Sequence, residues 1–480
     1  MKKLRSLSDI YQYFLDLEEP IYFVSGTPFN ILGLGQQVPS LRYISYFDCF
    51  DGHHYRVFSP NSNDNPEFTC MEDVVNYLLE NKEVEGFVDR TGNGLMLTVM
   101  FDEETEKLAK ALGMKIALPP ASLRTHIDSK IVTTRLGDEA NVPSVPNTMG
   151  TADTYEELNA LSEGAGIGTD LVVQTPYGDS GRTTFFIKSE EDWDKHSEDI
   201  IGEQLKVMKR IDNISGTVEG VATRNGTLVG PIMMEVVGHS KLTPYKGGWS
   251  GNENDPNFFE QERRDEIIGM VQRLGDRLYK EGYRGTFCMD FLIDTATGEA
   301  YLGEINPRIS GASPMTNLVT QKYGGVPMLF FHLLEYLDVD WELDLSAIQS
   351  RWMDYGCWST LVIKNTDDNV EIITQAPSSG IWRYDEGDIT FLRRSWDWSN
   401  VSSYKQGFYL RVLGAGEYVY KGADLGILLL RGRAQNDDGS LTSRVKGWIA
   451  AIRDQYKTTP PAADAQVPEP KQKGLLYKIN

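Results

Sequence analysis

Long apolar runs are missing from this sequence. No run of apolar residues approaches the roughly 20 that are needed to cross a bilayer, and residues 1–5 lead into a polar, helix-like stretch and not into a secretion signal. We therefore expect no membrane association, and the cytoplasm is the expected location.

Positive charge is also scarce. The 69 Asp and Glu residues outnumber the 47 Lys and Arg residues, so the formal net charge is -22. Nucleic acids attract basic surfaces and release counterions from them, so a general nucleic-acid-binding role is disfavoured. An anionic ligand would need a local basic pocket.

Cysteine is the third scarcity. The four cysteines are far apart, no two of them form a CxxC pair, and the histidines are not clustered. This pattern disfavours a disulfide framework and a zinc site, so we expect reduced thiols that lie mostly in the core. The cysteines are Cys49, Cys70, Cys288 and Cys357.

The 480 residues, of which 40% are hydrophobic, are enough for about three domains of mixed α/β and α+β class. Apolar runs alternate with helix-like stretches at the N-terminus, which predicts an open α/β domain. A long amphipathic helix is expected near Phe259 to Glu281. The expected parts are an N-terminal domain at 1–125, a central domain at 126–345, a strand-rich closing domain at 346–457 and a flexible, proline-rich tail at 458–480.

The strongest pattern is a predicted hairpin at residues 285–306. Alternate apolar residues on its first strand leave Asp290 on the opposite face. On the second strand, Glu304 and Asn306 are two residues apart and therefore share a face. A hairpin symmetric about Thr297 pairs Asp290 with Glu304, with Cβ atoms about 5 Å apart. The apolar residues are Phe287, Met289, Phe291 and Ile293.

Two carboxylates at this distance repel each other unless a cation lies between them. One or two Mg²⁺ ions about 4 Å apart, with Asn306 as a neutral ligand, would remove the repulsion and could clamp the phosphates of ATP. The alternative is a solvated sheet face whose acidic residues pair with nearby Lys or Arg. Arg308 favours the metal interpretation, because it adds a fixed cation suited to an acyl phosphate or a substrate carboxylate.

Residues 285–290 and 303–314 resemble the metal-binding segment of the ATP-grasp superfamily, in which an acidic residue, a Glu and an Asn hold magnesium around ATP. The resemblance implies ATP as cofactor and Mg²⁺ as the metal, with Mn²⁺ as the alternative ion. Upstream, Asp128-Ser129-Lys130 resembles the segment that opens the nucleotide site, so Lys130 is expected to contact phosphate.

A second segment, 171–184, is similar to the flexible strand and glycine loop that closes over the triphosphate in this superfamily, within a lid at about 150–212. Gln174 stands where many members have a second phosphate lysine, and Arg182 is the candidate replacement. A surface turn is the alternative interpretation. The nucleotide contacts implied here are Gln174, Tyr177, Gly178, Ser180, Gly181, Arg182 and Thr183.

A third segment, 206–211, resembles the interdomain strand whose backbone hydrogen-bonds adenine, with Lys209, Arg210 and Ile211 as the contacts. An edge strand with lysines that extend into solvent is the alternative. Glu219 matches an acidic position near the nucleotide more loosely.

The order of segments resembles biotin carboxylase, whose closing domain is similar to residues 379–426. After the arginine that matches Arg308, however, biotin carboxylase continues with Gln-Val-Glu, and that Glu is the bicarbonate base. This chain has Ser310-Gly311-Ala312, and Ala312 cannot take a proton. There is also no Met-Lys-Met tripeptide to accept biotin. Proteins of this architecture are often dimers, which makes a homodimer the candidate assembly.

The resemblance therefore implies an ATP-dependent ligase that joins a small carboxylate, such as an amino acid, to an amine through an acyl phosphate. Lys130 and Arg182 would hold the phosphates, and Arg308 the acyl phosphate. The glycine-rich stretch 238–251 is a candidate substrate loop, although it could also be a long surface connection. The expected substrate contacts are Lys241, Lys246, Trp249, Arg308, Ser310 and Gly311.

Three other functions remain open from the sequence. They are an ATP-dependent carboxylase, a kinase that stops at a phosphorylated product, and a nucleotide-binding protein without turnover. Bicarbonate-dependent ADP release would favour the first of these.

Overall fold

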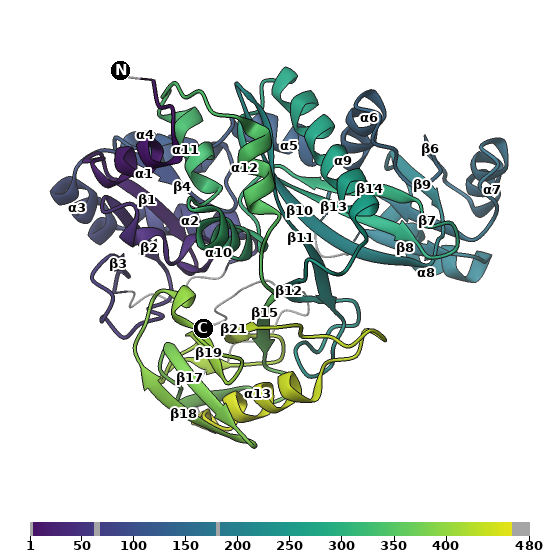
Figure 1. The fold of residues 1–480 in the computed structure, drawn as a ribbon. Coiled ribbons are helices and arrows are strands. Elements are labelled where there is room, and N and C mark those ends of the chain that lie inside the picture. Colours follow the sequence, from purple (N-terminus) through teal and green to yellow (C-terminus); the bar gives the residue numbers. More distant parts are fainter. Residues whose placement is uncertain (1–2, 62–67, 179–182, 463–480) are drawn as a thin grey trace.

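The computed structural model describes residues 3–61, 68–178 and 183–462, which are arranged around four sheets (Figure 1). In this part of the chain, no helix is long and apolar enough to cross a membrane.

The N-terminal region is an open, five-stranded parallel sheet in the order β3-β2-β1-β4-β5, as the sequence predicts. Every residue of the central strand β1 is buried, which is typical of a parallel sheet with both faces covered. The elements are α1 (Leu7–Leu15), β1 (Ile21–Ser25), η1 (Phe29–Ile31), η2 (Leu34–Gln36), β2 (Leu41–Ser45), β3 (Val57–Phe58), α2 (Met71–Glu80), α3 (Lys82–Thr91), β4 (Leu95–Leu97), α4 (Glu103–Ala111) and β5 (Lys115–Ile116).

A separate four-stranded antiparallel sheet, in the order β6-β9-β7-β8, follows and is called the lid sheet below. Its inner face has a small apolar core of its own around Trp193. The elements of this part are α5 (Ala121–Asp128), α6 (Lys130–Glu139), β6 (Asn147–Gly150), α7 (Tyr155–Gly164), β7 (Leu171–Gln174), β8 (Thr184–Ile187), α8 (Glu190–Ile200) and β9 (Leu205–Lys209).

A ten-stranded sheet forms the middle of the molecule, in the order β14-β13-β10-β11-β12-β15-β21-β19-β17-β18. Helix α9 covers its central strands and buries the apolar face expected from the sequence; Gly282, at φ 94°, follows the end of the helix. The first elements are β10 (Asn213–Thr223), β11 (Gly226–Val237), β12 (Trp249–Asn254), α9 (Gln261–Lys280), β13 (Gly285–Asp294), β14 (Ala300–Asn306), α10 (Ser313–Gly324), α11 (Leu329–Tyr336) and α12 (Leu345–Trp352).

The C-terminal part continues this sheet, because β12 pairs with β15. A hydrogen-bonded ladder thus crosses the boundary expected near residue 346. The remaining elements are β15 (Trp358–Lys364), β16 (Glu371–Gln375), β17 (Gly380–Asp385), β18 (Asp388–Arg393), η3 (Trp398–Asn400), β19 (Gln406–Arg411), β20 (Tyr418–Val419), β21 (Asp424–Arg431), α13 (Ser443–Arg453) and β22 (Lys457–Thr459). Strand β22 enters the stretch expected to be a flexible tail, of which residues 463–480 lie outside the described residues.

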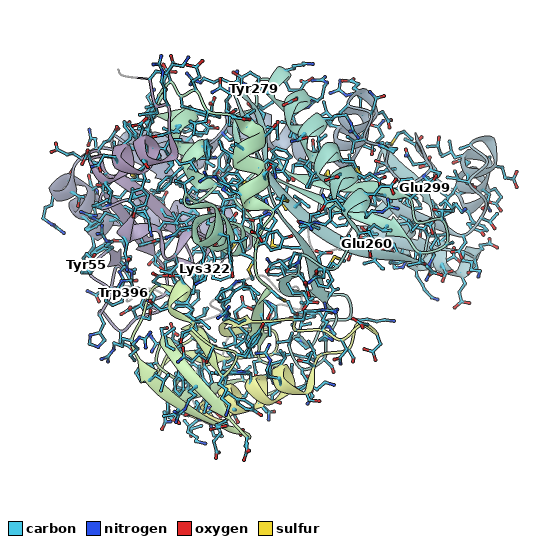
Figure 2. All side chains as sticks on the ribbon, viewed as in Figure 1. Tyr55, Glu260, Tyr279, Glu299, Lys322 and Trp396 are labelled. Atoms are coloured by element: carbon cyan, nitrogen blue, oxygen red, sulfur yellow. The ribbon has the colours of Figure 1, made fainter. Side chains whose placement is uncertain are left out.

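The C-terminal part also touches the N-terminal region. Arg411 donates to the carboxylate of Asp51 and to the carbonyl oxygen of Asp48, both at 2.6 Å. Tyr55 and Trp396, labelled in Figure 2, meet edge to face with ring centroids 6.2 Å apart. These contacts fix the C-terminal part against the N-terminal region.

Candidate active site

The hairpin of β13 and β14 brings the three expected metal ligands together. Asp290 pairs with Glu304 across the ladder, as the sequence predicts. Asn306 Nδ2 donates to Asp290 Oδ2 at 3.0 Å and to Glu304 Oε1 at 3.5 Å. The four apolar residues of β13 lie on the other face, in the core under α9.

A β-bulge at Gly303 sets this arrangement. The ladder pairs Phe291 with Leu302 but Asp290 with Glu304, so Gly303 is an extra residue on β14. In a regular strand Leu302 and Glu304 would share a face. The bulge turns Leu302 into the core, where it is 1% exposed, and leaves Glu304 beside Asp290. The symmetric hairpin predicted from the sequence lacks this bulge, although the pairing of the two carboxylates is confirmed.

Like charges surround Asp290. Its pKa is raised well above the usual range, first by burial and then by the neighbouring carboxylates of Glu235 and Glu304. Glu235, on β11, has a raised pKa for the same reasons. Nothing in the sequence pattern points to Glu235, because the pairing of β10 with both β11 and β13 brings it to this face.

The side chains of the hairpin fit a divalent cation. Carboxylate and amide oxygens are the ligands that Mg²⁺ uses in proteins, and a cation would relieve the repulsion at Asp290. Within the described residues, no three His, Cys, Asp or Glu side chains form a metal cluster, so the set is two carboxylates and one amide. Asn306 Oδ1 accepts from Arg308 Nη2 at 2.8 Å, so the amide would have to rotate to present its oxygen to a metal.

Lys130 connects the hairpin to the glycine loop. Its side chain is 6% exposed, and its Nζ donates to the carbonyl oxygen of Gly178 at 2.6 Å and lies 3.6 Å from Glu304 Oε2. The backbone N–H of Lys130 donates to Pro176 O at 2.8 Å. The loop is therefore tied to the start of α6, next to the carboxylates.

The two described ends of the glycine loop meet each other. Gly178, at φ 140°, leaves room for the side chain of Thr183, which a Cβ at this position would meet at 2.3 Å. Tyr177 is 53% exposed. The other expected contacts in this loop, Ser180, Gly181 and Arg182, lie outside the described residues.

Lys206 is a functional candidate that the sequence-based assignment misses. It is 1% exposed, although it lies on a strand of the lid sheet. Burial lowers its pKa to about 8, against the effect of Glu304, which raises the pKa. Directly opposite in the ladder is Gln174, whose amide donates to Thr184 Oγ1 at 3.0 Å.

In the segment expected to contact adenine, part of the backbone is already hydrogen-bonded to other parts of the protein. The N–H of Lys209 donates to Pro146 O at 3.0 Å, and the N–H of Arg210 donates to Asp170 O at 2.9 Å. Ile211 packs beside the small apolar cluster between the lid sheet and the hairpin. An adenine contact here would have to use the remaining backbone groups.

Glu219 supports the loop that follows Arg308. It is fully buried, and its Oε1 accepts hydrogen bonds from the hydroxyl groups of Ser310, at 2.8 Å, and Ser313. Burial raises the pKa of Glu219 to about 7, while these two hydrogen bonds lower it. Glu219 therefore positions the backbone around Ser310, where the sequence only suggested a place near the nucleotide.

Trp249 and Gly311, two expected substrate residues, are in contact. A Cβ at Gly311 would lie 2.7 Å from the indole ring, so only glycine lets the ring approach. Asn30 of the N-terminal region donates to Ser310 O at 2.7 Å. One wall beside Arg308 is thus built from three distant segments of the chain.

The rest of the expected substrate loop is attached to the C-terminal part. Leu242 is fully buried, Lys241 O accepts from Arg453 at 3.0 Å, and the side chains of Lys241 and Lys246 are exposed. In the part of the chain that the structure describes, no hydrogen bond or ion pair joins either lysine side chain to Arg308 or the hairpin carboxylates.

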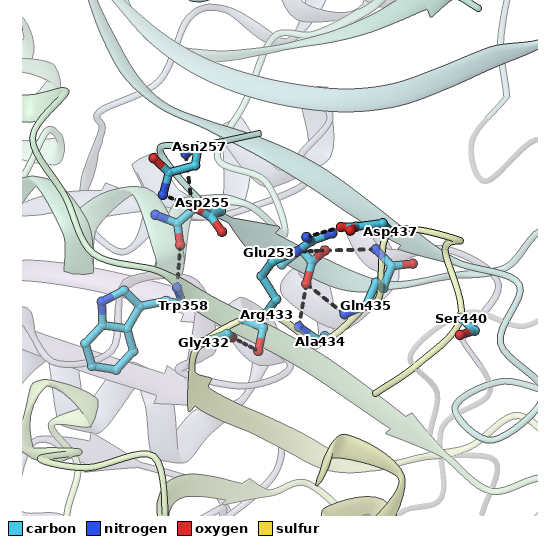
Figure 3. Close-up of polar contacts among 12 residues, drawn as sticks. Glu253, Asp255, Asn257, Trp358, Gly432, Arg433, Ala434, Gln435, Asp437 and Ser440 are labelled. Carbon is cyan, nitrogen blue, oxygen red and sulfur yellow. Dashed lines mark hydrogen bonds and ion pairs between the residues drawn. The ribbon is translucent and has the colours of Figure 1, made fainter. Parts of the chain in front are cut away.

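A buried glutamate holds this attachment in place. Figure 3 shows Glu253 of β12 accepting from the backbone N–H groups of Ala434 and Gln435. The side chain of Gln435 contacts His239, at 2.9 Å, and donates to Glu235 O at 3.2 Å. His239 is therefore a structural contact between the loop and the C-terminal part.

Comparison with known proteins defines the architecture. No family model matches the chain. The biotin carboxylase domain of Hydrogenobacter thermophilus 2-oxoglutarate carboxylase, solved with MgADP, ADP and bicarbonate, is 12% identical with a TM-score of 0.61; the match covers 92% of this chain and 91% of that one. The fold is that of biotin carboxylase.

Two further solved structures agree. Campylobacter jejuni biotin carboxylase gives a TM-score of 0.58 at 11% identity, over 94% of this chain and 89% of its own. N5-carboxyaminoimidazole synthase from Aspergillus clavatus, solved with ADP and 5-aminoimidazole ribonucleotide, gives 0.52 at 13% identity, over 91% and 98%. The ATP-grasp fold expected from the hairpin residues is confirmed across most of the chain.

Proposed function

We propose that this protein is an ATP-dependent ligase that joins a small carboxylate, such as an amino acid, to an amine through an acyl phosphate. The observation that carries the proposal is the facing pair Asp290 and Glu304, joined through Lys130 to the glycine loop. In this proposal, a divalent-cation site, a lysine and a phosphate-binding loop would surround one space. Structures with the same fold contain ADP, MgADP or ATP.

In the first step, a carboxylate oxygen of the substrate attacks the γ-phosphorus of ATP. The bond to the bridging oxygen of ADP breaks, and ADP leaves with that electron pair. Asp290, Glu304 and Asn306 would hold Mg²⁺, which supplies neutralisation of phosphate charge. Lys130, held between Gly178 and Glu304, would bind the phosphates.

In the second step, the amine nitrogen attacks the acyl carbon, phosphate leaves, and the nitrogen loses a proton as the amide forms. The guanidinium of Arg308 is oriented by Asn306, and its Nε has no hydrogen-bond partner among the described residues. It is therefore available to an acyl phosphate. Glu235 lies on the same sheet face as Asp290 and would attract the ammonium group of an amine.

Ala312 favours a ligase over a carboxylase that uses bicarbonate in the manner of biotin carboxylase. It is 4% exposed and has no group that can accept a proton. Its backbone N–H donates to Ser310 Oγ at 3.0 Å, so this part of the loop has a structural role around Glu219. The Hydrogenobacter thermophilus structure contains bicarbonate, so bicarbonate is the substrate to compare with other carboxylates in the test.

The test is a screen for ADP release with Mg-ATP and a panel of ¹⁸O-labelled carboxylates, with and without amines. An acyl-phosphate route transfers one ¹⁸O atom from the carboxylate to inorganic phosphate, which mass spectrometry detects. Release of ADP only with bicarbonate would support the carboxylase instead. Release of ADP with a carboxylate but without ¹⁸O in the phosphate would contradict the acyl phosphate.

A further inference from the structure

Lys206 is a buried cation without an anionic partner of its own. It is 1% exposed, and among the described residues no hydrogen bond or ion pair to its Nζ is found. Lys130, also buried, differs because Gly178 O and Glu304 hold its ammonium group. A buried ammonium group is costly unless an anion compensates it, so a ligand is the natural partner of Lys206.

The register of the lid sheet shows which way Lys206 faces. Lys206 lies between Met149 and Gln174 in the ladder, so these three side chains share a face. Met208, two residues further along the same strand, lies on that face too. Met208 packs with Tyr301 of β14, and Leu292 of β13 packs against this cluster. The face that carries Lys206 therefore looks toward the hairpin.

Two of the charged groups that affect the pKa of Lys206, Glu304 and Lys130, belong to the candidate site. Glu304 raises its pKa, Lys130 lowers it, and Asp138 of α6 raises it. Gln174 cannot add a charge, and its amide is engaged with Thr184 on the far side of β7. Lys206 and Lys130 thus approach the space over the carboxylates from two different elements, β9 and α6.

We propose that Lys206 binds the polyphosphate of the nucleotide and supplies, from β9, the cation that β7 lacks at Gln174. This inference rests on the proposed function, because it needs a nucleoside di- or triphosphate in that space. A phosphate chain would bind between the two lysines and the metal ligands, where it would supply negative charge. Its charge would compensate the buried ammonium group.

The experiment compares ADP and adenosine binding by calorimetry, with MgCl₂ present, in the unmodified protein and in Lys206→Met. Loss of one charge-assisted contact raises the dissociation constant for ADP by about 10- to 100-fold. Binding of adenosine, which has no phosphate, stays unchanged. The matched control is Lys188→Met, because Lys188 is an exposed lysine at the end of β8 in the same lid. It should bind ADP like the unmodified protein.

A double variant moves the charge back across the ladder. In Gln174→Lys combined with Lys206→Gln, the cation stands on the same face one strand away, and most of the ADP affinity should return. No recovery would contradict the idea that a cation on this face binds the phosphates. Thermal unfolding without nucleotide adds a second readout, since Lys206→Met removes a buried charge and should raise Tm.

The outcomes separate this inference from the proposed function. If the unmodified protein binds no ADP, the proposed nucleotide site itself fails. If it binds ADP and Lys206→Met binds ADP equally well, the role of Lys206 is wrong and the nucleotide site stands. Equal weakening of ADP and adenosine would likewise overturn the role, because it would show a general change in the lid.

Discussion

The hairpin of β13 and β14 and the loop at 238–248 both look like ligand-binding segments in the sequence, but they have different roles in the structure. The hairpin gathers Asp290, Glu304 and Asn306 on one face. The loop is attached to the C-terminal part and leaves Lys241 and Lys246 exposed, while only Trp249, at its end, reaches Gly311. Charge in a loop is thus a weaker sign of a site than charge on a strand opposite a buried face.

The largest expected effect is at the hairpin. Glu304→Gln removes a metal ligand and the partner of Lys130, so the rate of ADP formation should fall by roughly 10³-fold, with the fold kept. The control is Glu299→Gln, an exposed carboxylate in the turn of the same hairpin, labelled in Figure 2. Near-normal turnover of Glu304→Gln, measured by coupled ADP release, would sink the metal assignment.

The difference between the two segments also shows what the sequence could predict. Period-two alternation placed Asp290 and the apolar face of β13 correctly, because both depend on residues close in the chain. The position of Glu235 beside Asp290 depends on pairing between strands that are distant in the sequence. The bulge at Gly303 is local to the hairpin, but regular alternation does not predict it. Alternation on β9 also separates Lys206 from the core of the lid sheet, but it cannot tell a face in contact with the hairpin from a face in solvent.

Trp249 tests whether the end of the loop belongs to the substrate site. Trp249→Ala removes the ring that packs on Gly311, so we expect about a tenfold rise in KM for the carboxylate or amine substrate. The affinity for ADP should not change, since the ring is not among the groups that surround Lys130 or Lys206. Steady-state kinetics with each substrate varied in turn makes the measurement, and a rise confined to KM for ATP would contradict the placement.

The pH dependence of ADP binding tests Lys206 more finely. Because the pKa of Lys206 is about 8, its side chain is charged at pH 7 and loses this charge as pH rises through 8. The charged groups that affect this pKa are Glu304, Lys130 and Asp138. ADP affinity should therefore fall roughly fivefold between pH 8 and pH 9. When ADP binding to Lys206→Met is measured by calorimetry, this fall in affinity should be absent.

The same pKa gives a stability prediction. Because the folded-state pKa of Lys206 lies below the unfolded value, the unfolded chain binds more protons between about pH 8 and 10, and stability relative to Lys206→Met rises with pH there. Below pH 8 the cost of the buried charge is fully present. The gain in Tm of the variant should thus be largest near pH 7 and should shrink above pH 8.

The smallest expected effect is at the exposed loop lysines. Lys246→Ala should change kcat, KM and ADP affinity by less than about twofold, as is usual for exposed positions away from a site. The measurement is steady-state kinetics of Lys246→Ala, carried out in parallel with Trp249→Ala. A large loss of activity would show that the loop leaves the C-terminal part and closes over the substrate.

The magnesium dependence of ADP binding tests the central claim most directly. Calorimetric titrations of ADP, with MgCl₂ and with EDTA, compare the unmodified protein with Asp290→Asn combined with Glu304→Gln. We expect Mg²⁺ to strengthen ADP binding in the unmodified protein and to have little effect in the double variant. Equal strengthening by Mg²⁺ in both proteins would show that the metal lies elsewhere, and would contradict an ATP site built on this hairpin.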